Sequence, residues 1–325
     1  ENTVIDGNQS GTVVYMFRSS GRLEGFTIRN GSDSGVHAYV WSSPTIAKCI
    51  IEDNNGDRGA GLKVTFVSFP SVHETIIRNN RAEHYGGGVY GWYAGPNIYD
   101  SVITDNEAGI YGGGSASAYC RGYMALFRTF VTNNSAPYGG GLSLFGGYGT
   151  CFSNAYAINS IISGNSSEYG GGIYVGDGGS LKLNLSTVVD NTADYGGGIY
   201  SDGNINRSYN NIVYFNSTLP VIKNMDVWNF TLDHSIIEGG LDRPGIIDAD
   251  PLFVDLEGGD YHLSPGSPAI DSGIAYWHLP DHDIEGTPRP LDAGYDMGAY
   301  EFTNCKETPT VEITSVSPEA IWPPN

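Results

Sequence analysis

The sequence predicts an all-β protein, a right-handed single-stranded parallel β-helix (solenoid) of roughly nine turns that ends in an irregular C-terminal cap. Three observations predict this class. The motif Tyr-Gly-Gly-Gly recurs five times, with tyrosines 26, 27, 31 and 26 residues apart. A short apolar run ending in asparagine keeps the same period, and no segment shows a helical repeat of apolar residues. The repeated tyrosines are Tyr85, Tyr111, Tyr138, Tyr169 and Tyr195.

Each repeat contains short runs rich in β-branched and aromatic side chains, bounded by Gly, Asn, Ser or Asp, which is typical of strands. Three such strands and no helix fit one turn of a parallel β-helix, in which turns stack about 4.8 Å apart. One turn alone cannot bury its inner face. A stack of turns forms one long core of Val, Ile and Leu.

The repeated asparagines are expected to form a ladder of hydrogen-bonded side-chain amides at a tight corner, because equivalent residues of successive turns lie above one another. The glycines are expected to allow a sharp bend and a close approach of backbones, and replacement of Gly171 is expected to be poorly tolerated if its φ is positive. The predicted ladder residues are Asn54, Asn80, Asn106, Asn134, Asn165, Asn191 and Asn216. A column of small residues stands five positions before them: Cys49, Thr75, Ser101, Thr129, Ser160 and Ser186.

These repeats resemble the secreted right-handed parallel β-helix repeat proteins of bacteria and archaea, a superfamily that includes pectate lyases, other polysaccharide lyases and glycosidases. The likeness covers about residues 1–240. The downstream segments DADPLFVD, DYHLSPGSPAIDSG, GTPRP and DMGAYEF resemble a C-terminal segment found after such repeats in surface proteins. The resemblance implies a secreted or cell-surface protein and a structural end-piece without catalytic residues.

We expect three parts in the chain. Residues 1–240 are the predicted β-helix repeats, residues 241–302 an acidic, loop-rich cap packed on the helix, and residues 303–325 a linker and the start of a truncated further module. The sequence begins within the strand-like TVIDG and without a signal peptide, which is typical of a mature or trimmed fragment. Further domains of the same parent chain are therefore expected partners.

Composition excludes some classes of function. The net charge is −20 and no basic stripe offsets it, so nucleic acid is not an expected partner. No apolar run approaches twenty residues, so no transmembrane segment is expected. Residues 241–301 carry 13 acids against Arg243 and Arg289. This density makes calcium a candidate ligand, although no EF-hand spacing is present and a solvated acidic surface is the alternative.

The four cysteines show no CxxC spacing and hence no zinc signature. Cys120 and Cys151 fall on consecutive predicted turns, where either a disulfide across the stack or two free thiols fits. Cys49 belongs to the column of small residues and is expected to be a buried free thiol.

One outward face of the predicted helix carries aromatic residues in open rows. If the apolar residue after the last glycine of a repeat points inward, the next residue and the one two positions further point outward. Sugar rings stack on such surfaces, whereas packing of the rings on one another is the alternative. The tyrosines before the glycines are expected to form a structural stack instead. The predicted substrate-binding residues are Tyr39, Tyr90, Trp92, Phe145, Tyr174 and Tyr200.

Titratable residues gather beside this face in the first turns. His37 and Lys63 share an outward column, Arg58 holds the position equivalent to the repeat tyrosine, and His84 precedes Tyr85. A β-eliminating lyase needs a cation or metal to neutralise the uronate carboxylate and a base to remove the C5 proton. These four residues are therefore the predicted catalytic set, with a solvated mixed surface as the alternative.

The sequence thus predicts an extracellular or cell-surface protein that binds polysaccharide and, if it is an enzyme, cleaves it by lyase-type β-elimination. A glycoside hydrolase is the second enzymatic possibility, with Asp177 and Asp202 as its weaker pair of carboxylates. The competing interpretation is a noncatalytic adhesin or a structural spacer of a larger surface protein. Short loops and the lack of a recognisable catalytic motif favour that competitor.

Overall fold

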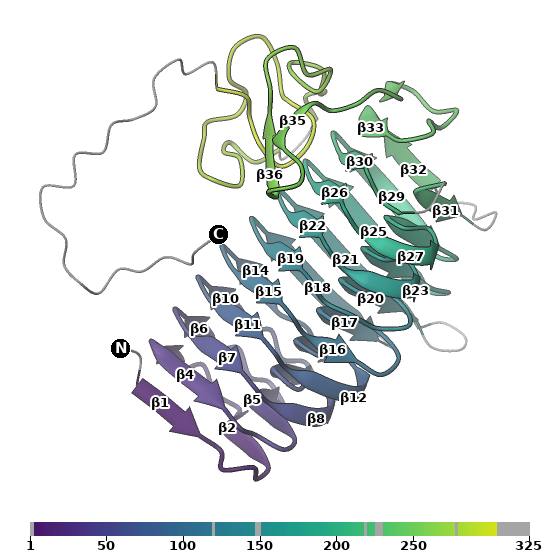
Figure 1. The fold of residues 1–325 in the computed structure, drawn as a ribbon. Coiled ribbons are helices and arrows are strands. Elements are labelled where there is room, and N and C mark those ends of the chain that lie inside the picture. The colour runs from purple at the N-terminus through teal and green to yellow at the C-terminus, as the bar shows by residue number, and fades with distance from the viewer. Residues whose placement is uncertain are drawn as a thin grey trace, which may run out of the picture.

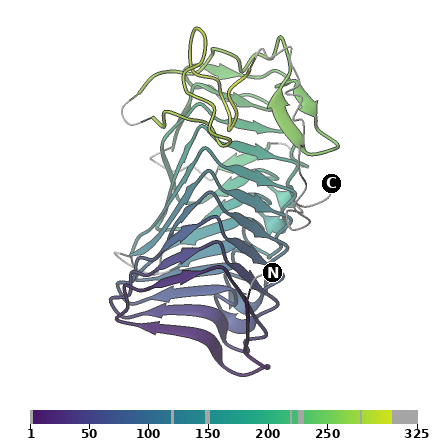
Figure 2. The same cartoon turned by 90° about the vertical axis from the view of Figure 1, so that its left-hand side faces the viewer.

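The computed structural model describes residues 3–118, 121–146, 151–217, 220–224, 230–276 and 279–303. Within these ranges the chain forms strands and no helix, and its turns stack along one axis (Figure 1). Figure 2 shows the same stack turned by 90°, with the C-terminal loops at the end opposite the first turns. Cys120 and the segment 304–325 lie outside the described residues.

Three long parallel sheets run the length of the stack, and two of them have nine strands each, in line with the predicted number of turns. Sheet A comprises β1 (Thr3–Asp6), β4 (Phe26–Arg29), β7 (Ile50–Glu52), β11 (Ile76–Arg78), β15 (Val102–Thr104), β19 (Phe130–Thr132), β22 (Ile161–Ser163), β26 (Thr187–Val189), β30 (Ile212–Tyr214), β33 (Ser235–Ile237) and β34 (Ile246–Ile247). Sheet B comprises β2 (Thr12–Phe17), β5 (Ser34–Tyr39), β9 (Leu62–Thr65), β13 (Val89–Trp92), β17 (Ser115–Ala118), β20 (Leu142–Phe145), β24 (Ile173–Val175), β28 (Ile199–Ser201) and β31 (Ile222–Asn224). Sheet C comprises β3 (Arg22–Glu24), β6 (Thr45–Ala47), β10 (Ser71–His73), β14 (Asn97–Tyr99), β18 (Gly122–Phe127), β21 (Ser153–Ile158), β25 (Gly179–Asn184), β29 (Asn204–Tyr209) and β32 (Phe230–Asp233).

A fourth, shorter strip of strands, sheet D, lies between sheets A and B in each middle turn. It comprises β8 (Asn55–Arg58), β12 (Arg81–Tyr85), β16 (Glu107–Ala108), β23 (Ser166–Tyr169) and β27 (Thr192–Tyr195), with isolated bridges at Ser135 and Tyr138 that continue it across the intervening turn. The chain therefore passes through sheets A, D, B and C in turn before it begins the next coil. The asparagine corner joins A to D, and the glycine corner joins D to B.

The core fills the space inside sheets A, B and C with the inward side chains of each strand. Val36, Leu62, Val89, Leu142, Ile173 and Ile199, the residues predicted to point inward after the glycines, all have no exposed surface. Sheet D contributes only small inward residues, among them Ala82, Ala108 and Ala136, because the stack is narrow there. Successive strands pair in register, so residues at equivalent positions contact one another along the stack.

The predicted asparagine ladder is present and buried. Each side-chain amide donates to the Oδ1 atom of the next asparagine, as in Asn54 to Asn80 at 2.9 Å and Asn80 to Asn106 at 3.0 Å. The series runs unbroken to Asn216. In the second column, the backbone N–H of Thr75 donates to Ser101 Oγ at 3.1 Å, so these hydroxyls also join turns. Cys49 is a buried free thiol, as expected.

The glycine corner combines a special backbone conformation with close contact between turns. The positive φ, +67°, belongs to Gly170, the first glycine of its triplet, and not to Gly171. Gly171 is required for another reason, since a Cβ atom there would lie 2.5 Å from the carbonyl oxygen of Gly197. Gly170 therefore provides the bend, and Gly171 permits the close approach of the next turn.

The C-terminal segment covers the outer side of sheet A over the later turns. Its hairpin of β35 (Phe253–Asp255) and β36 (Asp260–Leu263) is antiparallel. Tyr261 and Tyr300 pack with Ile161 of β22, and the Ala299 N–H donates to Thr187 Oγ1 at 3.1 Å. The segment is built mainly from loops, which agrees with the irregular cap that the sequence predicts.

Candidate functional site

The tyrosines that precede the glycines form the expected stack. Ring centroids of Tyr111 and Tyr138 are 4.8 Å apart, those of Tyr138 and Tyr169 5.1 Å, and those of Tyr169 and Tyr195 5.0 Å, with nearly parallel planes. Arg58 takes the equivalent place one turn before Tyr85, and its guanidinium lies 5.0 Å from the centre of that ring. This column is structural, because its rings bind one another along sheet D.

The same stack covers much of the face that the sequence predicts to be open, and four of the six predicted substrate-binding residues contact it. Tyr90 is only 1% exposed and Tyr174 only 9% exposed, so their prediction as open platform residues is wrong. The ring centroids of Phe145 and Tyr111 are 4.3 Å apart, and those of Tyr200 and Tyr169 are 5.3 Å apart in an edge-on contact. The cause is the sharp glycine corner, which folds sheet D back so that its tyrosines reach over the outer side of sheet B.

A partly exposed aromatic strip remains in the first four turns, and it includes the other two predicted residues, Tyr39 and Trp92, which are half-buried. Ring centroids of Phe17 and Tyr39 are 6.0 Å apart, those of Tyr39 and Phe66 5.2 Å, and those of Phe66 and Trp92 4.6 Å. Three of these rings end β2, β5 and β13, and the fourth, Phe66, comes directly after β9. The four rings therefore follow one another along the stack. We call Phe17, Tyr39, Phe66 and Trp92 the aromatic strip.

The corner that follows sheet B adds Trp41 and Tyr93 to the side of this strip, and neither of them nor Phe66 was predicted from the sequence. Phe66 and Tyr93 come directly after β9 and β13, and Trp41 comes two residues after the end of β5; all three have positive φ and are exposed, Trp41 to 67%. Val40 and Val67 share this left-handed conformation, which is costly for β-branched residues, at about 1–3 kcal/mol each. The signal in the sequence was the aromatic residue that recurs at the end of each of these strands.

His37 and Lys63 lie side by side in register on β5 and β9, as predicted. Lys63 Nζ donates to Asp33 Oδ1 at 2.9 Å, and Asp33 also accepts from Thr12 Oγ1 at 2.8 Å. Burial raises the pKa of Asp33, but these hydrogen bonds outweigh it and hold the pKa below its usual value. Burial and then the charge of Lys63 lower the pKa of His37 to about 4, and its Nε2 lies 2.9 Å from Thr65 Oγ1. At neutral pH the imidazole is therefore uncharged.

Arg58 and His84, the other two predicted catalytic residues, meet on sheet D instead. Both contact Asp57: Arg58 Nε lies 3.2 Å from Asp57 Oδ2, and His84 Nδ1 forms a short contact with Asp57 Oδ1. The four residues thus separate into two pairs, each arranged around its own aspartate. Within the described residues, one group of three metal-ligating side chains has atoms close enough to hold an ion, namely Asp57, Glu83 and His84.

The carboxylates named for a hydrolase are neighbours on adjacent turns. Burial raises the pKa of Asp202, and the charge of Asp177 adds to this against a hydrogen bond with Tyr200. Asp177 is exposed, whereas Asp202 is half-buried. A protonated acid beside an ionised one is the general requirement for glycoside hydrolysis.

Two polar hollows follow the outer side of the asparagine corner and of sheet D. The first, of about 440 Å³, is lined in part by Asp53, Asp105 and Glu107. The second, of about 380 Å³, continues from Glu107 to Glu168. These hollows are open and acidic, which favours cations or neutral polymers over anions.

Many carboxylates of the acidic C-terminal segment are used inside it. Asp283 accepts from the N–H groups of Thr287 and Glu301, at 2.8 and 3.0 Å. Arg289 is buried, donates to the Asp296 and Gly298 carbonyl oxygens, and lies 3.8 Å from Glu301. These groups hold loops together, and calcium binding in this segment stays a prediction. Cys151 is disulfide-bonded, but its predicted partner Cys120 lies outside the described residues.

Comparison with known proteins bears on this architecture. Residues 1–125 match the family model described as "Right handed beta helix region". Across 90% of this chain and 72% of the other, the structure is similar to the crystal structure of pectate lyase Pel9A, with a TM-score of 0.52 and 11% sequence identity. The fold is a right-handed parallel β-helix.

No curated protein matches the sequence of this right-handed β-helix. At 11% identity the likeness to the pectate lyase extends to the fold alone, so no catalytic residue passes from one to the other. In the part of the chain that the structure describes, no helix is long and apolar enough to cross a membrane. The site must therefore be argued from its own residues.

Proposed function

We propose that this β-helix binds an extended polysaccharide outside the cell, along the aromatic strip of its first four turns. The observation that carries the proposal is the continuity of the strip, in which Phe17, Tyr39, Phe66 and Trp92 succeed one another at 4.6–6.0 Å. Ring spacing close to the stacking repeat lets one linear polymer contact several turns at once. Aromatic faces suit the apolar C–H faces of sugar rings.

The backbone supports a binding role for this surface. Val40 and Val67 adopt a left-handed conformation that costs free energy, and the same corner holds Trp41, Phe66 and Tyr93 in solvent. Strained backbone gathered around exposed rings is typical of ligand-binding surfaces. Exposed apolar patches on a soluble domain also mark interaction sites.

Cleavage by β-elimination is a second candidate, favoured by the Lys63–Asp33 pair and by His37. His37 lies on β5, the strand of Tyr39, Lys63 lies on β9, which precedes Phe66, and Asp33 lies directly before β5. Lys63 would neutralise the uronate carboxylate, and uncharged His37 would accept the C5 proton. A pKa of about 4 makes His37 a weak base, and Nε2 already contacts Thr65. The geometry therefore supports binding more strongly than catalysis.

Binding is tested with a panel of soluble acidic and neutral glycans, followed by titration of variants with a glycan that binds. Trp92→Ala and Trp41→Ala are each expected to weaken affinity by about 1 kcal/mol or more, since they remove aromatic contacts. Phe152→Ala is the matched control, because Phe152 is 57% exposed and outside the strip. Equal losses in all three variants, or a parent protein that binds no glycan, would leave the structural spacer as the better interpretation.

Catalysis is tested on the same glycan by the absorbance of unsaturated uronate ends. A lyase would lose turnover by orders of magnitude in Lys63→Ala while still binding, whereas an adhesin would show only a modest, salt-dependent loss of affinity. Release of reducing ends without unsaturation, abolished in Asp202→Asn, would instead identify the hydrolase.

A further inference from the structure

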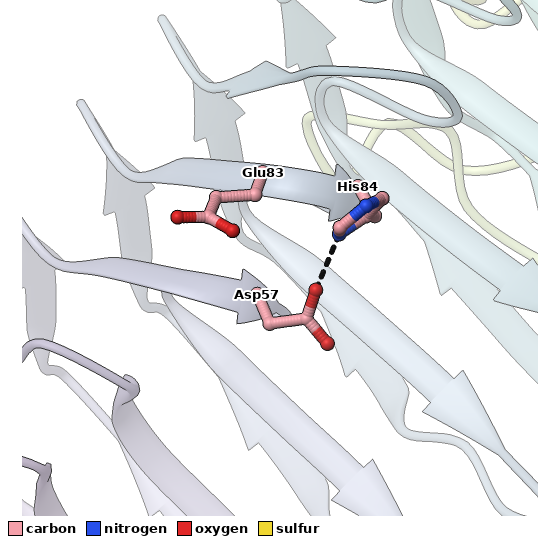
Figure 3. A group of neighbouring side chains, drawn as sticks. All are labelled: Asp57, Glu83 and His84. Carbon is pink, nitrogen blue, oxygen red and sulfur yellow. Dashed lines mark hydrogen bonds and ion pairs between the residues drawn. The ribbon is translucent and has the colours of Figure 1, made fainter.

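We propose that Asp57, Glu83 and His84 form a binding site for a divalent first-row transition metal ion of the zinc class (Figure 3). This inference concerns sheet D and goes beyond polysaccharide binding at the aromatic strip. One ligand atom from each residue, two carboxylate oxygens and an imidazole nitrogen, lies within 4.8 Å of the others. Such a separation lets three ligands close around one ion with small side-chain rotations.

A β-bulge brings the three side chains together. Ala82 pairs with Gly56 and Tyr85 with Arg58, so two residues of β12, Glu83 and His84, stand opposite the single residue Asp57 of β8. In a regular strand neighbouring side chains alternate between faces. The extra residue breaks this alternation, and Figure 3 shows Glu83 and His84 on one strand with Asp57 on the next.

The bulge originates in the lengths of two turns. Leu62 follows Asn54 by eight residues, whereas Val89 follows Asn80 by nine. Because the asparagine and glycine corners are fixed in register, the additional residue must be absorbed between them. The carbonyl oxygen of His84 accepts from the N–H groups of both Ile110 and Tyr111, at 3.0 Å each, which fixes the bulged backbone from the other side.

The donor set selects the class of metal. One imidazole with two carboxylates suits zinc and its neighbours, whereas calcium prefers six to eight oxygens and magnesium an octahedron of oxygens. Arg58 holds Asp57 Oδ2 at 3.2 Å and leaves Oδ1 directed at His84, as expected of an outer partner that orients a metal-binding carboxylate. The Glu83 side chain is exposed and forms no ion pair within the described residues, so its charge is available to a cation.

Other histidine–carboxylate groups in the chain lack this convergence. His262 has Asp260 at Nδ1, 2.6 Å away, and Glu285 at Nε2, 3.1 Å away, so its two carboxylates lie on different edges of the ring. His282 contacts Asp281 at 2.9 Å. These exposed pairs are abundant in the molecule, and only the bulge adds a third ligand on the same side, within the described residues.

The test is calorimetric titration of tag-free, chelator-treated protein with Zn²⁺, and Co²⁺ titration followed by its visible absorption. The parent protein is expected to bind one ion at this site, with an absorption band typical of nitrogen and oxygen ligands. His84→Gln and Glu83→Gln are each expected to weaken affinity at least about tenfold, because loss of even an outer partner of a metal ligand typically costs about 10- to 100-fold. Circular dichroism checks that both variants fold, as exposed or half-exposed substitutions should.

His282→Gln provides the matched control, since it removes an exposed histidine that is already paired with a carboxylate, and it should leave affinity unchanged. Excess Ca²⁺ or Mg²⁺ should not displace Co²⁺. Failure of the parent to bind Zn²⁺ or Co²⁺, equal affinity in His84→Gln and parent, or displacement by Ca²⁺ would each overturn the assignment. The loss of glycan affinity expected in Trp92→Ala concerns a different surface, so failure of metal binding leaves the polysaccharide proposal unaffected.

Discussion

The side-chain amide of Asn106 donates to Asn134 Oδ1 at 3.0 Å, and the Asn106 backbone N–H donates to the same oxygen at 2.9 Å. Each rung of the ladder thus joins two turns through one acceptor and two donors. Asn106 Nδ2 also reaches the Ile77 carbonyl oxygen at 2.9 Å, one turn back. A single buried amide therefore connects three successive turns.

Removal of one rung is expected to be costly. Asn106→Ala should lower the free energy of unfolding by about 1–3 kcal/mol, because buried donors and acceptors above and below lose their partners. Thermal or urea unfolding measures the loss. Asn55→Ala, at an exposed position of β8, is the control and should change stability by less than about 0.5 kcal/mol. Similar losses at the two positions would contradict the special role of the ladder.

The glycine corner permits a comparison between two glycines of similar φ. Gly170→Ala should destabilise strongly, because its φ is +67° and a Cβ atom would lie 2.2 Å from the Ile173 carbonyl oxygen. Gly25→Ala, at a φ of +73° with no atom within 4 Å, should cost only the conformational penalty of about 1–2 kcal/mol. Melting temperatures separate the two effects, and equal shifts would show that close contact contributes nothing.

The tyrosine stack should matter most in its middle. Tyr138 contacts Tyr111, Tyr169 and Tyr174 at 4.8–5.2 Å. Tyr138→Ala should therefore destabilise by at least about 1 kcal/mol more than Tyr195→Ala, at the half-exposed end of the column, since aromatic pairs contribute about 0.5–1.5 kcal/mol each. Chemical unfolding of both variants provides the comparison. A larger effect at Tyr195 would argue against cooperative stacking.

The buried charges of the C-terminal cap should make its stability depend on pH. Burial, with the nearby Asp296 acting in the same direction against Arg289, raises the pKa of Glu301 from 4.5 to about 8. Between these values the folded state binds more protons than the unfolded state, so stability falls as pH rises from about 4.5 to 8 and levels off above. The expected loss is on the order of 1 kcal/mol or more.

Glu301→Gln tests this dependence because it keeps a neutral side chain of the same shape. The variant should flatten the pH profile of cap unfolding, followed by hydrogen exchange of residues 279–303, and should stabilise the cap at pH 8. Glu257→Gln, at an exposed position, should leave the profile unchanged. A profile that keeps its slope without Glu301 would assign the titration to another group.

The features that repeat with the turns are predictable from the sequence. The ladder from Asn54 to Asn216 and the tyrosine column follow from spacing alone, because register converts a sequence period into contact. Alternation also identified the inward residues correctly. Alternation does not show what covers an outward residue, because that depends on the angle of the glycine corner. Tyr90 and Tyr174 are therefore predicted to be open, although they are buried.

The candidate sites were harder to predict because they arise where the repeat is broken. Trp41 and Phe66 stand in a left-handed corner outside the strand register, and neither follows from alternation. Asp57 and Glu83 meet only because adjacent turns differ by one residue. The sequence predicts His84 and Arg58 as catalytic residues but not Asp57 or Glu83, since the partner of a bulged residue cannot be identified from either turn alone.

The fixed register of the ladder has a geometric consequence for the length of the molecule. Every rung joins equivalent residues of consecutive turns, so equivalent positions on different turns are separated along the axis by a whole number of steps of about 4.8 Å. Insertion or deletion of one complete coil changes the distance between the aromatic strip and the cap by one such step and leaves all other interfaces intact. The length of the protein therefore changes in steps of one coil.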